Sequence, residues 1–247
     1  MMGSVRCPAT CAAAGVRMQA GADADPGVSR VGGRTKYSVR VCINKTCKGQ
    51  GSPGVLQFAQ DLCHPDLDVN SCGCLGNCGN GPNMVILPAE REVSHVGTPA
   101  RMAEVLNMEC GIQVSSDLVE ATQCRQSGNV LARSGKLKEA MDKYSEGIAL
   151  GVSSTLHLLY SNRSGVRLTL GDHEGAQADA LLAVEHAPVG FTTAHIRLID
   201  AYYIQGQYEQ SAQVLQNLVD TNPEFRATKE FSLISKQLEK DLKVVAR

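Results

Sequence analysis

The chain has no tryptophan, and aromatic residues make up only 4% of its 247 residues. Single-stranded nucleic acid is bound by stacking bases on aromatic rings, so this scarcity argues against such a site, and it weakens a sugar-binding interpretation in the same way. The formal net charge is −1, so no excess of positive charge favours nucleic acid or an anionic membrane surface. No apolar run approaches the roughly 18 residues of a membrane-spanning helix. We therefore expect no nucleic-acid partner and no membrane span.

The N-terminal segment lacks acidic residues. Residues 1–22, MMGSVRCPATCAAAGVRMQAGA, contain Arg6 and Arg17, are rich in small residues, and precede the first acidic residue, Asp23. They lack the apolar core of a secretory signal, and their composition is typical of organelle transit peptides. We predict a transit peptide and disordered linker over residues 1–35, with the chloroplast stroma as the location. The mitochondrial matrix is the alternative location, and an ordinary disordered N-terminus is the other interpretation.

Residues 36–110 alternate between strand and helix patterns. The segment KYSVRVCI alternates apolar with more polar positions, which predicts a half-buried strand. GSPGVLQFAQDLC has an apolar helical face, with Ser52 as a candidate N-cap ahead of a proline. MVILP is a fully apolar strand ended by Pro88, and GTPARMAEVLNM repeats the helix start with Thr98 before a proline. Together these elements predict a small α/β layer.

The second half of the chain repeats itself. Aligning NVLARSGKLKEAMDKYSEGI, GVRLTLGDHEGAQADALLAV and DAYYIQGQYEQSAQVLQNLV places three glycines in register, at separations of 36 and 35 residues. Each glycine is followed five residues later by a small residue. The glycines are Gly135, Gly171 and Gly206, and the small residues are Ala140, Ala176 and Ser211.

A period near 34 residues, with small residues where two helices cross, is typical of tetratricopeptide repeats. We predict three such repeats over residues 117–223, with Pro188 and Pro223 closing the second and the third. A polar-faced capping helix over residues 224–247 would follow, because repeat arrays need a terminal helix that shields their core. The predicted fold class is therefore a two-domain chain with an N-terminal α/β domain and a C-terminal all-α superhelix.

Two pairs of cysteines stand out among the ten in the chain. Cys42-x4-Cys47 and Cys74-x3-Cys78 each follow a predicted strand, so both loops can emerge at the same end of the sheet. Four thiolates that meet there would bind a soft metal centre. Neighbouring glycines let the backbone turn sharply and direct N–H groups at sulfur, which tunes such a centre. These glycines are Gly73, Gly76, Gly79 and Gly81.

The residues alone leave other uses of these thiols open. A structural zinc site would also use four thiolates, although it favours the closer C-x2-C spacing. A dithiol redox site needs C-x-x-C, which is absent, but Cys72 and Cys74 could oxidise together. A cysteine nucleophile requires a histidine partner. The histidines of this half, His64 and His95, lie in no recognisable motif.

The motif VCINKTCKGQGS, followed by GCLGNCGNGPNMVI, resembles the thioredoxin-like [2Fe-2S] ferredoxins, including the homologous small subunit of respiratory NADH dehydrogenases. The resemblance covers residues 36–110 and implies a thioredoxin-like fold with a [2Fe-2S] cluster as cofactor. Cys72 lies outside the motif, as a bystander thiol or a spare ligand. The metal ligands that the resemblance implies are Cys42, Cys47, Cys74 and Cys78.

Within the repeats, RQSGNVLARSGKLKEAMDKYSEGI and LYSNRSGVRLTLGD resemble the tetratricopeptide domains that grip the C-terminal carboxylates of heat-shock chaperones. Guanidinium groups and amides suit a terminal carboxylate and an acidic side chain. Thr193 stands where the family has a basic residue, so one contact is missing. The other interpretation is that the arginines are solvated and the asparagines structural. The peptide-binding residues implied by the resemblance are Arg125, Asn129, Asn162 and Arg197.

These patterns lead to one main hypothesis and two alternatives. In the main hypothesis an organellar [2Fe-2S] protein exchanges electrons with a redox partner, or senses redox state, while its repeats bind a partner protein. In the first alternative it is an assembly factor or co-chaperone, whose cluster is structural or cargo and whose repeats bind an acidic C-terminal tail. In the second it is an accessory subunit of a larger oxidoreductase. None of these roles needs a substrate pocket, so we do not expect an enzyme.

Overall fold

The computed structural model describes residues 30–31, 34–35, 37–62 and 64–245. The predicted transit peptide and linker lie outside the described residues, apart from two short strands, β1 (Arg30–Val31) and β2 (Arg34–Thr35). The chain divides into two compact units, Met1–Gln123 and Cys124–Arg247. The division falls within helix α4 (Ser116–Arg133), so this helix begins in the first unit and ends in the second.

The first unit contains a four-stranded mixed sheet. Its strands are β3 (Tyr37–Cys42), β4 (Leu67–Cys72), β5 (Met84–Leu87) and β6 (Arg91–Val93). Their order is β4-β3-β5-β6, with β3 parallel to β4 and the other pairs antiparallel. The helices are α1 (Lys45–Gly49), α2 (Ser52–Asp61) and α3 (Pro99–Cys110). A small α/β unit is therefore present, and β6 adds a strand that the sequence pattern did not predict.

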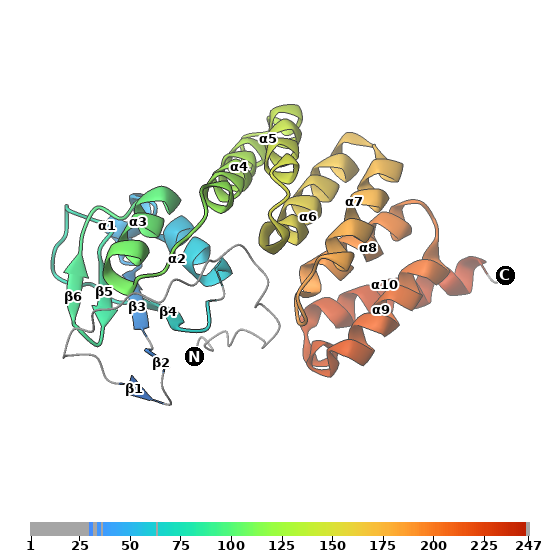
Figure 1. Ribbon diagram of the computed structural model, residues 1–247. Coiled ribbons are helices and arrows are strands. Elements are labelled where there is room, and N and C mark those ends of the chain that lie inside the picture. The colour runs from blue at the N-terminus through green and yellow to red at the C-terminus, as the bar shows by residue number, and fades with distance from the viewer. Residues whose placement is uncertain (1–29, 32–33, 36, 63, 246–247) are drawn as a thin grey trace. The chain divides into compact units, whose positions relative to one another are not determined.

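One face of this sheet forms the core of the unit. Val39 and Val41 of β3 are at most 1% exposed, and their partners across the antiparallel pair, Ile86 and Met84, are at most 2% exposed. Helix α2 contacts β3, β4 and α3. Figure 1 shows α2 and α3 beside the sheet. Because side chains alternate between the faces of a strand, Val39 and Val41 share the core face, as the pattern predicts. Cys42 at the end of β3 departs from this alternation, since it is also buried, at 1% exposure.

The helix starts follow the sequence signals, with one correction. Thr98 caps α3, and its side-chain oxygen accepts a hydrogen bond from the backbone N–H of Arg101 at 3.2 Å. At α2, Ser52 is the first helical residue and not the N-cap. The N-cap is Gly51, whose φ of 103° favours glycine and whose missing Cβ would lie 2.9 Å from the carbonyl oxygen of Gly97. The sequence pattern could not predict this N-cap, because the close approach of Gly51 to Gly97 is a contact between segments distant in the sequence.

The second unit is a stack of helical hairpins, drawn from yellow-green to red in Figure 1. After α4 come α5 (Leu137–Ala149), α6 (Ser153–Leu170), α7 (His173–Glu185), α8 (Thr192–Ile204) and α9 (Tyr208–Thr221). Helices α6 and α7 pair within one hairpin and α8 and α9 within the next, while α5 contacts α6 and α7 contacts α8 between hairpins. A single hairpin cannot bury its apolar face, so stacking completes a continuous core.

The three aligned glycines lie in the turns between the paired helices. All three have positive φ, in the left-handed region that glycine adopts without strain. These angles are 79° at Gly135, 81° at Gly171 and 72° at Gly206. The small residues that follow have no exposed surface, at Ala140, Ala176 and Ser211. The repeat pattern predicted from the sequence is confirmed at these positions.

The repeats end in a short turn of 3₁₀-helix and a long final helix. Pro223 begins η1 (Pro223–Ala227), and α10 (Lys229–Val245) follows. The predicted capping helix is therefore present, but it begins at Lys229 and not at residue 224. Phe225 of η1 is 4% exposed and belongs to the same core cluster as Leu218 and Leu238. Across the part of the chain that the structure describes, no helix combines the length and apolar character of a membrane span.

Replacing Ala176 with leucine should destabilise the second unit. Ala176 is 0% exposed, and its carbonyl oxygen accepts a hydrogen bond from the Ser164 hydroxyl of α6 at 2.8 Å, so α6 and α7 leave no room for a larger side chain. The expected loss is about 1–3 kcal/mol in the free energy of unfolding, measured by urea denaturation. Ala178→Leu on the exposed face of α7 is the matched control and should cost less than about 0.5 kcal/mol. Equal stability of the two variants would contradict the close packing.

Candidate functional site

Two parallel strands bring the cysteine-bearing segments to one edge of the sheet. Cys42 ends β3, Cys72 ends β4, and the two residues are register partners. The loop 73–83, which carries Cys74 and Cys78, starts at this edge and leads back into β5 beside β3. Both cysteine pairs of the sequence motif therefore lie at one edge of the sheet. We term this edge the thiol edge, and its cysteines are Cys42, Cys47, Cys72, Cys74 and Cys78.

Helix α1 places Cys47 inside the thiol edge. Asn44 caps this helix by accepting a hydrogen bond from the backbone N–H of Lys45 at 2.7 Å, and Cys47 is 2% exposed. Burial raises the pKa of the Cys47 thiol, while a backbone hydrogen bond from Asn83 acts in the opposite direction. A Cβ added at Gly81 would lie 2.6 Å from Cys47 Sγ. Position 81 therefore admits no side chain unless the thiol moves.

The two exposed cysteines of the loop lie beside each other. Cys74 Sγ and Cys78 Sγ are 3.4 Å apart. The backbone N–H of Gly76 donates a hydrogen bond to Cys74 Sγ at 3.4 Å, and this bond lowers the pKa of the Cys74 thiol. The hydrogen bond to Cys74 raises the pKa of Cys78. Gly76 and Gly79 have φ values of 85° and 107°, so glycine is needed for the sharp turns of this loop.

The thiols also interact across the edge. Burial raises the pKa of Cys72, and the charges of Cys42, Cys47 and Cys74 raise it further. The charges of Cys47 and Cys42 likewise contribute to the raised pKa of Cys78. Because neighbouring negative charges raise the pKa of Cys72 and Cys78, a bound cationic centre would favour the ionised form of these two thiols. Within the described residues, no three Cys, His, Asp or Glu side chains converge in the geometry of a single metal ion.

A pair of amides links the first two repeats. Asn129 Oδ1 accepts hydrogen bonds from the Tyr144 hydroxyl at 2.8 Å and from Asn162 Nδ2 at 2.9 Å. An amide oxygen has two lone pairs, so this oxygen is fully used and the NH₂ group of Asn129 points the other way. Arg125 lies one turn earlier on α4 and is 8% exposed. Three of the predicted peptide-binding residues therefore lie close together.

The fourth predicted residue, Arg197, lies on α8 against α6. A Cβ added at Gly165 would be 3.3 Å from Arg197 Nε. Arg197 Nη1 is 3.5 Å from a carboxylate oxygen of Asp200, and both side chains are about 40% exposed. Gly165 follows Asn162 by about one turn of α6. The guanidinium of Arg197 and the amide pair therefore contact neighbouring turns of the same helix. We term the set the peptide row, and its members are Arg125, Asn129, Asn162 and Arg197.

Other arginines in the repeats hold helices together. Arg163 donates two hydrogen bonds, at 2.8 and 2.7 Å, to the two carboxylate oxygens of Asp179. Arg167 Nη1 lies 3.4 Å from the same carboxylate, which is 2% exposed. This buried network joins α6 to α7, and removing one partner would leave an uncompensated charge. The Asp179 carboxylate thus holds Arg163 and Arg167 between α6 and α7.

A buried histidine lies beside the peptide row. His157 of α6 is 8% exposed, and its ring contacts that of Phe191 edge-on, with centroids 4.7 Å apart. Burial lowers the pKa of His157 to about 4, and the charge of Arg125 acts in the same direction. The imidazole of His157 is therefore neutral at pH 7 and adds no second positive charge beside Arg125.

Three residues that the sequence pattern did not single out complete these sites, namely Tyr144, Gly165 and Asn83. Tyr144 orients an amide of the peptide row, and Gly165 makes room for its last guanidinium. Asn83 is 4% exposed and directs its Nδ2 toward Cys47 Sγ at 3.9 Å. Only Gly165 carried a signal, since glycine inside a helix costs stability and needs a reason. The other two act through contacts between segments distant in the sequence.

No protein-family profile matches the chain. The chain is similar to the small glutamine-rich tetratricopeptide repeat-containing protein 2 of Mycosarcoma maydis, at 28% identity over 121 residues, which cover 49% of this chain and 34% of that protein. It is also similar to the Hsp70-Hsp90 organizing protein of Triticum aestivum, at 33% identity over 96 residues, which cover 36% of this chain and 16% of that protein. The chain thus spans about a third or less of the length of these relatives.

Two solved structures are similar to parts of the chain, with TM-scores below 0.5. The first tetratricopeptide domain of Spaghetti (RPAP3), bound to the HSP90 peptide SRMEEVD, has a TM-score of 0.44 and 23% identity, over 52% of this chain and 97% of that chain. The thioredoxin-like [2Fe-2S] ferredoxin from Aquifex aeolicus has a TM-score of 0.28 and 19% identity, over 31% of this chain and 86% of that chain.

The second half of the chain is a tetratricopeptide repeat domain, which is a protein-binding module. Its hairpins, the glycine turns at the predicted spacing and the buried small residues all agree with this class of repeat. The similarity to a protein named for the same repeats agrees with it as well.

The buried histidine makes the stability of the second unit depend on pH. Its folded-state pKa of about 4 lies below the ordinary 6.5, so the unfolded chain takes up the proton first as the pH falls. Stability is therefore fully present above about pH 6.5 and is lost progressively down to about pH 4, by about 3 kcal/mol. In His157→Phe and His157→Gln this loss should disappear. Urea denaturation at about pH 7 and about pH 4.5 measures it, and an unchanged pH profile in both variants would contradict the assignment.

Proposed function

We propose that the repeat domain binds the C-terminal tail of a partner protein through the peptide row. The observation that supports this most directly is the hydrogen bond between Asn129 and Asn162, because it holds two amides from different repeats in one place. Guanidinium groups flank the pair, with Arg125 one turn away on α4 and Arg197 against α6. Two amides and two cations from three helices suit a terminal carboxylate and a neighbouring acidic side chain.

The amides and the arginines would contact the tail in different ways. With its oxygen occupied by Tyr144 and Asn162, Asn129 has its NH₂ group available to donate to a carboxylate oxygen. Arg125 is mostly buried, so its charge is weakly screened and acts strongly on an anion beside it. Arg197 is more exposed and would contact the second carboxylate. The terminal carboxylate is the feature that separates a chain end from an internal acidic segment.

The tail of an Hsp70 or Hsp90 chaperone is the partner that we propose. One of the sequence relatives is named an Hsp70-Hsp90 organizing protein, and the peptide row carries charges of the sign that an acidic tail requires. The protein would then act as a co-chaperone or assembly factor. This role corresponds to the alternative hypothesis drawn from the sequence, and it has more support than the electron-transfer hypothesis.

The peptide SRMEEVD and its C-terminal carboxamide test this proposal. The whole protein should bind the free acid, and the carboxamide should bind at least about tenfold more weakly because it loses a charged acceptor. Arg197→Ala and Asn162→Ala should each weaken binding of the free acid by about tenfold, measured by fluorescence anisotropy. Lys138→Ala, which removes an exposed charge from α5, is the matched control and should bind as the wild type does.

Equal affinity for the acid and the carboxamide would exclude recognition of a chain end. Wild-type affinity in both Arg125→Ala and Arg197→Ala would exclude the peptide row as the site. Because Arg125 is mostly buried, its variant needs a thermal melt beside the binding curve, and Arg197→Ala decides the question if Arg125→Ala unfolds.

We propose as a second function that the first unit holds a [2Fe-2S] cluster at the thiol edge. The support is the parallel register of Cys42 with Cys72, which brings the end of β3 and the start of the loop with Cys74 and Cys78 to one place. The residues fit the group, because the donors are thiols and Gly81 leaves its space to a sulfur. The β–α–β unit followed by a hairpin and a helix is compatible with the thioredoxin-like fold that the sequence motif implies.

The chain's own residues would tune such a centre. A bound cluster supplies one-electron redox chemistry, and its potential depends on hydrogen bonds to its sulfurs and on its burial. The N–H of Gly76 already points at Cys74, and the side chain of Asn83 points at Cys47. Two of the proposed ligands are buried and two are exposed, so one side of the centre would face solvent and a redox partner. Electron transfer or redox sensing in the chloroplast stroma, with the mitochondrial matrix as the alternative, is the role we propose for it.

Anaerobic purification of the whole protein tests the cluster. The expected sample contains about two irons and about two sulfides per chain and gives an S = 1/2 EPR signal on reduction. Serine at Cys42, Cys47, Cys74 or Cys78 should abolish the iron content, whereas Cys124→Ser in the repeat domain should retain it. Cys72→Ser decides whether that thiol is a ligand or a bystander. A colourless, EPR-silent protein with one zinc per chain would overturn the proposal and favour a structural site.

A further inference from the structure

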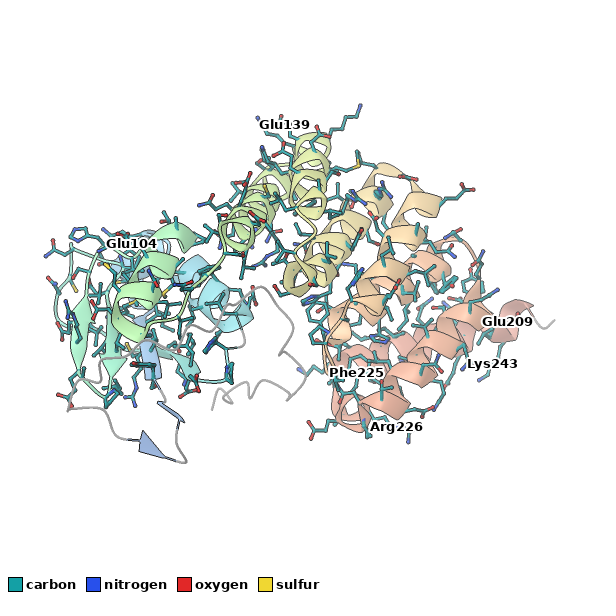
Figure 2. All side chains as sticks on the ribbon, viewed as in Figure 1. Glu104, Glu139, Glu209, Phe225, Arg226 and Lys243 are labelled. Atoms are coloured by element: carbon teal, nitrogen blue, oxygen red, sulfur yellow. The ribbon has the colours of Figure 1, made fainter. Side chains whose placement is uncertain are left out.

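The repeat domain has an open cavity of about 490 Å³ at the N-terminal end of α8. Its walls come from three elements, namely the first turns of α8, the turn η1, and the start of α10. Thr193 and Ile196 line it from α8, Phe225 from η1, and two acidic residues, Glu224 and Glu230, from η1 and α10. Figure 2 labels Phe225 at the end of the α9–α10 pair that lies below α8.

The cavity has an apolar floor and an acidic rim. Phe225 is 4% exposed and Ile196 packs against the same core cluster, so both present carbon atoms to the cavity. Glu224 and Glu230 are exposed, and neither forms an ion pair within the described residues. None of the residues that line the cavity is positively charged. Arg226, which is close in sequence, is not one of the lining residues. A lysine or arginine side chain, with a methylene stem and a charged end, is complementary to such a site.

The fold explains one hydroxyl and one carboxylate of the cavity. The hydroxyl of Thr228 donates to the carbonyl of Phe225 at 2.7 Å and accepts the N–H of Phe231 at 3.1 Å, so it caps α10 and is not available to a ligand. Glu230 lies in the first turn of α10, where the helix dipole stabilises a carboxylate. Its carboxylate lines the cavity together with that of Glu224.

The cavity continues the peptide row. Thr193 precedes Arg197 on α8 by four residues, which is a rise of about 6 Å along one face of the helix. Thr193 therefore lies one turn from Arg197 and also lines the cavity. A basic residue at position 193 would repel a cation from the cavity, and threonine does not.

We propose that the cavity is a subsite for a lysine or arginine side chain of the bound tail, upstream of its terminal carboxylate. This inference rests on the proposed peptide function. The replacement of the usual basic residue by Thr193 then has a consequence for specificity. One acidic contact of the tail is lost, and a basic contact at the neighbouring cavity is gained. The preferred tail has acidic residues and a free carboxylate at its end, and a basic residue before them.

The peptide SRMEEVD contains one arginine, so it can be compared with SAMEEVD on the same protein. We expect SRMEEVD to bind about two- to fivefold more tightly at low ionic strength, and the difference to shrink in high salt. In Glu224→Gln/Glu230→Gln the two peptides should bind equally. A lysine moved through each upstream position of SAMEEVD identifies the residue that reaches the cavity. Anisotropy on labelled peptides measures all of these affinities.

Two further variants separate the cavity from general electrostatics. Glu209→Gln removes an exposed acidic charge from the first turn of α9, away from the cavity, and should keep the wild-type ratio between the two peptides. Figure 2 shows Glu209 at the opposite end of the α9–α10 pair from Phe225. Thr193→Lys should remove the preference for SRMEEVD and strengthen binding of SAMEEVD, because it restores a cation to the row and places it beside the cavity.

The outcomes distinguish this inference from the function on which it rests. If SAMEEVD and its carboxamide bind equally, or neither peptide binds, the proposed function fails and the subsite fails with it. If binding depends on the free carboxylate but no basic position improves it, the proposed function stands and the subsite is wrong. If the preference for a basic residue survives in Glu224→Gln/Glu230→Gln, another part of the protein recognises the cation and the subsite is again wrong.

Discussion

In each repeat, two helices approach so closely that only a small side chain fits between them. Ala140, Ala176 and Ser211 occupy these crossings without any exposed surface. The glycine turns before them let the chain reverse direction in a few residues. Since the side chains of the peptide row come from α4, α6 and α8, their spacing depends on how the helices pack. A larger residue at a crossing would therefore change the spacing of the peptide row without contacting it.

The two units position the side chains of their candidate sites by different means. In the first unit, the carboxyl ends of two parallel strands define an edge, and a loop shaped by glycines returns to it. In the repeat domain, rigid helices carry the residues, and hydrogen bonds between helices set their orientation. The thiol edge thus relies on a loop whose glycines adopt positive φ beside a sheet, whereas the peptide row relies on helices held by their packing.

Charge is distributed unevenly within a chain whose net charge is −1. On the repeat domain, Arg125 and Arg197 provide positive charge at the peptide row, while Glu224 and Glu230 provide negative charge at the cavity one turn beyond. Arg163 and Asp179 neutralise each other between helices and contribute to neither. A ligand that matches both regions carries charges of both signs in a set order, which is a stricter requirement than net acidity.

The order of the helices, their turns and the buried small residues could be read from the sequence, because glycine and alanine recur at a fixed spacing and each has a local reason to be there. The strand ended by Pro88 and the helix capped by Thr98 were readable for the same reason. The cap of α2 was not, since Gly51 is selected by its approach to Gly97, a residue distant in the sequence.

The candidate residues of both sites could also be named from motif spacing, but their environment could not. Tertiary structure alone decided that Asn129 bonds to Asn162, that Arg125 is buried beside a neutral histidine, and that Thr193 borders an acidic cavity. Spacing along a chain determines which residues share a helix face. Which faces meet, and which charges then lie together, depends on the packing of elements that are far apart in the sequence.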